Sequence, residues 1–151
     1  MKSKEFMQLL DSLGACSDAK RWAEGKSFHV VWITCKRGDW LLWLCGKMDD
    51  KKGWPTRKQL VLAACACAET ALKYVPEGEE RPRIAIETAR KWARGKATLE
   101  QVKEAATNAP YAAAYAYAYA AAAAAADASA RTKVLAECAK IVRRTLKEPR
   151  P

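Results

Sequence analysis

Apolar residues recur along most of the chain at the three- and four-residue spacing of an α-helix. Four of them between Phe6 and Leu13 share one helical face, and Ser3 is the expected N-cap of that helix. A second short helix is expected over residues 18–23, with Ser17 as its cap. A glycine follows each segment, as is common where helices end.

Two strongly apolar runs come next. Residues 28–35, FHVVWITC, are rich in β-branched side chains, so a strand is the alternative to a helix. No neighbouring segment offers a strand partner, and we therefore expect a short helix. Asp39 is the expected cap of the following helix, WLLWLCGKM, which is apolar on nearly every side. Such a helix is buried or lies at an interface.

The second half of the chain carries clearer helix boundaries. Residues 49–55 form a charged loop with glycine and proline and make the best internal boundary. Thr56 and Thr98 are each followed three residues later by glutamine, the pattern of a capping box. Pro82 suits a first helical turn. The expected helices run over 56–74, 82–94, from 98 onward, and over 130–146, with the tail 147–151 frayed.

Residues 111–126 contain only alanine and tyrosine. Alanine is the best helix former, so this tract should extend the preceding helix, with a kink or restart at Pro110. Tyr111, Tyr115 and Tyr119 share one face. We expect them to pack in a homo-oligomer interface, with core packing and a ligand-stacking wall as the alternatives.

These elements predict an all-α protein, a compact bundle of about seven or eight helices with a long alanine-rich C-terminal helix kinked near Pro110. A chain of 151 residues suits one domain, 1–151. Within it, 1–50 and 56–146 are possible subdomains.

The charge balance narrows the partners. The chain has 27 Lys and Arg against 17 Asp and Glu, a net charge of +10. The excess lies in residues 1–60 and 111–151. A basic surface favours nucleic acid, phosphorylated small molecules, acidic proteins or anionic lipid, and it argues against an acidic mimic of DNA.

Few residues offer catalytic or metal chemistry. No secretory signal precedes the six cysteines, so we expect the protein in a reducing compartment, the cytoplasm of a bacterial host. No segment is expected to span a membrane. The chain has one histidine, His29, and this count excludes sites with two histidines. His29 lies in an apolar run and is expected to be buried. Cys65 and Cys67 should point to opposite sides of a helix. We expect no enzyme, no metal and no cofactor.

Two basic clusters are the candidate binding residues. In the first, Lys36 and Arg37 precede a helix N-terminus that could hold phosphate, and Trp40 or Trp43 could stack on a base. The alternative is that Asp39 caps the helix, both tryptophans fill the core and the basic residues are solvated.

In the second cluster, preceded by Arg81, one helical face carries Arg83, Glu87 and either Arg90 or Lys91. The simplest interpretation is a ladder of charges along the helix. The guanidinium groups of Arg81, Arg83 and Arg90 could also bind a phosphate or carboxylate.

Several motifs resemble a known family. They are Cys67-Ala68-Glu69, Arg81-Pro82-Arg83 with Ala85-Ile86-Glu87, Ala89-Arg90-Lys91-Trp92 with Gly95, and the alanine-rich helix. Together they resemble the helical immunity-protein (immunity-five-like) domain family of phages and toxin-associated loci. The resemblance implies an all-α, non-catalytic protein of biological conflict.

These observations lead to three main functional hypotheses, with a cysteine-based enzyme as the least favoured fourth. The first is a phage or mobile-element protein that antagonises a bacterial defence system by sequestering an anionic nucleotide signal. The second is an immunity protein that neutralises a toxin by binding it. Nucleic-acid binding ranks third, because the charge is split between the chain ends and no recognition motif is present.

Overall fold

The computed structural model describes residues 1–49, 51–70, 72–75, 77–108 and 128–150. Within these residues every regular element is helical, which confirms the all-α prediction. Segment 28–35 is mostly helix, as expected. The α-helices are α1 (Ser3–Ser12), α2 (Ser17–Ala23), α3 (Phe28–Thr34), α4 (Gly38–Lys47), α5 (Arg57–Glu69), α6 (Arg81–Ala93), α7 (Leu99–Asn108) and α9 (Ala128–Thr145), and the 3-10 turn η1 is Leu72–Tyr74.

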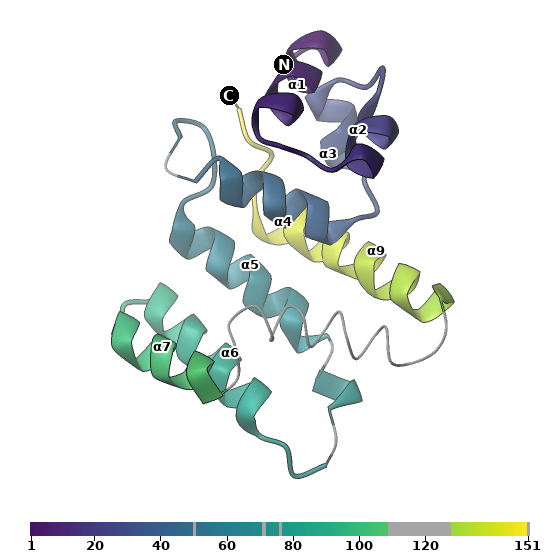
Figure 1. Cartoon of the computed structure of the whole chain (residues 1–151). Helices are drawn as coiled ribbons and strands as arrows, with labels where there is room; N and C mark the ends of the chain where they lie inside the picture. Colours follow the sequence, from purple (N-terminus) through teal and green to yellow (C-terminus); the bar gives the residue numbers. More distant parts are fainter. Residues whose placement is uncertain (50, 71, 76, 109–127, 151) are drawn as a thin grey trace.

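The longer helices are stacked side by side (Figure 1). Helix α4 packs on α9, and both contact α5. On its other side α5 packs on α6, which in turn contacts α7. Helices α1 to α3 form a group at the α4 end of the stack, where both chain termini also lie (Figure 1).

Helix α5 has two buried faces because it is built largely from small residues. Ala63 and Cys67 belong to a large core shared with α1 to α4 and α9. Cys65 belongs instead to a smaller core with Ile86 and Ala89 of α6. The prediction that Cys65 and Cys67 point to opposite sides is thereby confirmed.

The contact between α4 and α9 is exceptionally close at Gly38. A Cβ atom at this position would lie 2.5 Å from Cβ of Cys138 and 2.6 Å from the backbone nitrogen of Ala139. Glycine is therefore the residue that lets the first turn of α4 rest directly on the backbone of α9.

The capping boxes are confirmed, and three other caps were wrongly predicted, one of them at α2, where Cys16 is the N-cap because the helix already begins at Ser17. The backbone N–H groups of Thr56 and Thr98 donate to the side-chain oxygens of their glutamines at 2.9 and 2.8 Å. Lys2, not Ser3, is the N-cap of α1. Arg37, not Asp39, is the N-cap of α4, because the helix already begins at Gly38 and places Asp39 within its first turn.

Some helix ends also differ. Helix α5 ends at Glu69 instead of continuing to Tyr74, which lies in the separate turn η1. Helix α6 begins at Arg81, so that Pro82 occupies the first turn as expected.

The C-terminal tail is not frayed, and His29 is not buried. The backbone N–H of Arg150 donates to the Gly53 carbonyl at 3.0 Å, and Pro149 is buried. His29 is exposed on α3 and lies 2.9 Å, from Nδ1 to Oε1, from Glu148. The ion pair between Glu148 and His29 helps to hold the tail in place. It could not be predicted from local sequence, because the two residues lie far apart in the chain.

The expected kink at Pro110 and the tyrosine interface of Tyr111, Tyr115 and Tyr119 lie outside the described residues. They stay predictions, as does the division of the chain into subdomains.

The contact at Gly38 can be tested by substitution. Gly38→Ala should lower the free energy of unfolding by about 1–3 kcal/mol, because the new methyl group meets backbone atoms of α9 that cannot rotate away. The measurement is chemical denaturation followed by circular dichroism.

The matched control is Gly46→Ala on the same helix. Its nearest heavy atom, Cδ2 of Leu60, would lie 3.5 Å away, an ordinary contact. This variant should gain stability, up to about 1 kcal/mol from helix propensity. Equal stability changes in the two variants would contradict the close packing of α4 on α9.

Candidate functional site

The first basic cluster surrounds the start of α4. Arg37 Nε donates to Oδ1 of Asp39 at 2.8 Å, and the Arg37 guanidinium carbon lies 4.4 Å from the Trp40 ring centroid. The hydrogen bond with Asp39 raises the pKa of Arg37. The guanidinium is thus held between a carboxylate and an aromatic face.

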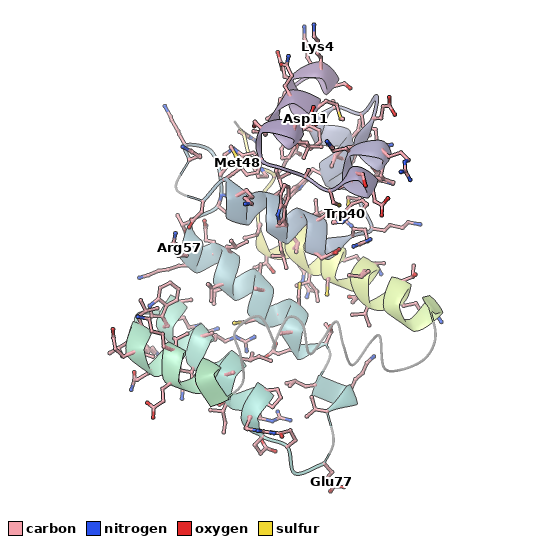
Figure 2. The ribbon with its side chains drawn as sticks, in the orientation of Figure 1. Lys4, Asp11, Trp40, Met48, Arg57 and Glu77 are labelled. Carbon is pink, nitrogen blue, oxygen red and sulfur yellow. The ribbon has the colours of Figure 1, made fainter. Side chains whose placement is uncertain are left out.

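A second tryptophan extends this arrangement from α2. The rings of Trp22 and Trp40 have centroids 6.1 Å apart and are tilted by 56°. Lys26 Nζ lies 4.7 Å from the Trp22 ring centroid and donates to the Trp22 carbonyl oxygen. Figure 2 shows Trp40 on the part of α4 that lies nearest α2.

Trp43 lies one turn after Trp40, with Lys47 Nζ 6.0 Å from its ring centroid. All three rings are half-buried. Each ring therefore has a cation above it: Lys26 over Trp22, Arg37 over Trp40 and Lys47 over Trp43. We call these six residues the tryptophan face.

The three tryptophans line a small, partly open cavity together with apolar side chains of α1 to α4. Its volume is about 30 Å³, and almost none of its lining is polar. One water molecule needs about 10–15 Å³ of such space, so the cavity has room for two or three small groups, and a nucleobase would have to bind at its open side.

The second basic cluster is divided among separate ion pairs. Arg81 Nε donates to Glu79 at 2.8 Å, and Arg83 Nε lies 3.2 Å from Glu80. Arg90 Nη1 reaches Glu69 on α5 at 2.6 Å, and this hydrogen bond lowers the pKa of Glu69. The ion pairs of Arg83 and Arg90 therefore run to Glu80 at the N-cap of α6 and to Glu69 of α5, whereas the expected ladder placed Glu87 between them.

The structure does not bring the two clusters together. Helix α5 lies between α4 and α6 (Figure 1). On the α4 side of α5 lie the residues of the first cluster: Lys36, which is exposed, Arg37, Trp40 and Trp43. On its α6 side lie those of the second cluster: Arg81, Arg83 and Arg90. Tyr111, Tyr115 and Tyr119 fall outside the described residues.

Sequence reasoning missed half of the tryptophan face. Trp22, Lys26 and Lys47 were not singled out, because the contact between Trp22 and Trp40 joins two helices and no periodicity encodes it. The tryptophan content was the available signal, since six in 151 residues are many for one core.

Two of the buried thiols, those of Cys45 and Cys65, are poorly suited to nucleophilic chemistry. Five of the six cysteines are buried and only Cys16 is exposed. Burial raises the pKa of Cys45 to about 12 and that of Cys65 to about 11, so both remain protonated at neutral pH.

The described part of the chain holds no cluster of three or more potential metal ligands among its histidines, cysteines and carboxylates. Over the same residues, no helix is both long and apolar enough to cross a membrane.

Thiol labelling tests this distribution. At pH 8, a disulfide reagent such as 5,5′-dithiobis(2-nitrobenzoate) should modify Cys16 rapidly in the folded protein, because its side chain alone is exposed. The buried thiols should react only on unfolding. Cys16→Ser is the control and should abolish the fast phase; a fast phase that persists in this variant would contradict the burial of the other five.

Comparison with known proteins places the chain in a family. A comparison with curated proteins and one with solved structures gave no match. A family model described as "Imm-5 like putative immunity protein" matches residues 54–143, which include α5, α6, α7 and most of α9. The tryptophan face precedes this segment. Because the match covers more than half of the chain, the protein belongs to the Imm-5-like immunity protein family.

Proposed function

We propose that this chain is a non-catalytic immunity-type protein that neutralises a toxin or defence protein by binding it directly. Membership of the family supports a role in biological conflict. The observation that carries the proposal is the tryptophan face, where three half-buried rings each lie under a cation.

The tryptophan face has the composition of a protein interface. Tryptophan and arginine are enriched among the residues that dominate binding energy. The rings are already fixed by neighbouring helices, so little side-chain entropy is lost when a partner packs on them. The net charge of +10 favours an acidic partner and speeds its association.

Sequestration of an anionic nucleotide is the second candidate. It is favoured by the guanidinium of Arg37 on the face of Trp40, next to the exposed Lys36 at the start of α4. Phosphate would have to displace Asp39 from Arg37, and the base would have to stack outside the cavity. For these reasons we place nucleotide sequestration second. In this case the protein would serve a phage or mobile element by removing a signal of the host defence system.

Co-expression tests direct neutralisation. Bacteria that produce toxins encoded beside genes of this family should regain growth when this chain is produced, and the purified pair should form a 1:1 complex by light scattering. Trp40→Ala should weaken that complex by about 2 kcal/mol, roughly thirty-fold in Kd, as expected for an interface anchor.

Trp92→Ala provides the matched control, since Trp92 is also half-buried but lies on α6, away from the tryptophan face. It should leave the affinity nearly unchanged. Absence of rescue across the toxin panel, or equal losses in the two variants, would contradict the proposal.

Calorimetry separates the second candidate from the first. If the chain sequesters a nucleotide, a panel of cyclic nucleotides and ADP-ribose derivatives should yield a binding heat that Arg37→Gln removes through the lost charge. Lys140→Gln, an equal charge change at an exposed position of α9, should not affect it. No heat across the panel would eliminate this candidate and leave neutralisation by protein binding.

A further inference from the structure

We infer that the cavity between Trp22, Trp40 and Trp43 receives an aliphatic side chain from an acidic segment of a partner protein. The inference rests on the proposed function in one respect, because it takes the partner to be a protein. It adds the place of contact and the chemistry of the segment that binds there.

The cavity is built where four helices meet. Phe6 of α1, Ala19 of α2 and Val31 of α3 contribute to its lining, together with the three rings of the tryptophan face. All of these groups are apolar, and the cavity is partly open to solvent. Its entrance and the half-buried rings therefore form one continuous apolar surface.

The lining selects an apolar occupant. A water molecule in a cavity needs two to four polar partners, and this lining offers almost none. An aliphatic group inserted there would gain contacts with the surrounding carbons and lose little hydration.

The size of the cavity restricts that occupant further. A volume of about 30 Å³ accommodates a methyl group or the branched tip of a leucine or valine, with the remainder of the side chain resting on the tryptophan rings. An indole or phenyl ring would require the helices to separate.

The cations around the rings define the charge of the segment. Lys26, Arg37 and Lys47 each lie over one of the three rings that line the cavity. Asp39 already pairs with Arg37, whereas Lys47 is exposed at the far end of α4. Carboxylates on either side of the aliphatic residue would therefore lie near cations, and a basic segment would be repelled.

The same observations favour protein over nucleic acid. RNA would use the cations but has no aliphatic group to place in the cavity, and DNA has only the methyl group of thymine, so nucleic-acid binding should follow mainly charge and salt. Filling the cavity therefore distinguishes the two ligands.

Peptide display tests the inference without knowledge of the natural partner. A library of random dodecapeptides is selected on the intact chain, with Ala19→Leu as the counter-selection target because leucine at position 19 extends into the cavity. Enriched peptides should carry one aliphatic residue flanked by aspartate or glutamate. Ala19→Leu should bind a synthetic enriched peptide at least about tenfold more weakly, as for loss of an anchor contact.

A second pair of variants tests the charges without disturbing the packing. Lys47→Gln should weaken peptide binding by up to about fivefold, the range of an exposed charge pair. Lys96→Gln, with the same charge loss beyond α6, should have no effect. The inference is overturned if no sequence is enriched, if enriched peptides are neutral or basic, or if folded Ala19→Leu binds as well as the unmodified chain.

These outcomes are independent of the toxin-rescue experiment. Rescue of growth together with a failed selection would keep the immunity function and remove this cavity as its site. Selection of acidic aliphatic peptides without rescue would keep the site and remove toxin neutralisation.

Discussion

The close contact of Gly38 with the backbone of α9 is the constraint on which the rest of the structure depends. It brings α4 against a helix that begins 81 positions after α4 ends, and α5 packs on both. From the same helix α9, Arg143 donates to the carbonyl oxygens of Trp32 and Cys35 at 3.2 and 2.8 Å. These carbonyls at the end of α3 would otherwise lack a helical partner. Helix α9 therefore fixes both the start of α4 and the end of α3.

This arrangement determines which side of α4 is available for binding. Leu41, Leu44 and Cys45 are buried in the large core, which leaves Trp40 and Trp43 half-buried on the side nearest α2. Both rings pack against that core on one side and line the cavity on the other. A surface held in this way is preorganised, and binding to it does not require the tryptophans to be ordered first.

Local sequence was sufficient for most helices and insufficient for the contacts between them. The boxes at Thr56 and Thr98 were predictable because both partners lie within one turn. The exposure of His29 was not, because its partner Glu148 lies 119 residues away. The same limit explains the pairing of Arg90 with Glu69 and the contact of Trp22 with Trp40, each of which joins two helices. Helix periodicity gives the side of a helix that is apolar, and it does not identify what that side meets.

The division between the family segment and the preceding helices has a physical consequence. Residues 54–143 hold α5, α6, α7 and most of α9. The tryptophan face lies before this segment, on α2 and α4, with Lys26 and Arg37 just outside these two helices. These two parts meet through the close contact of Gly38 with Ala139, through the rings of Phe28 and Trp54, and through Arg143, which donates to carbonyl oxygens at the end of α3. Substitutions of the three cations can change the charge of the tryptophan face, whereas substitutions of its rings also reach the core that holds Ala63 and Ala139. The charge of this surface is thus separable from the packing of α4, α5 and α9, so binding specificity can be altered through charge while that packing is retained.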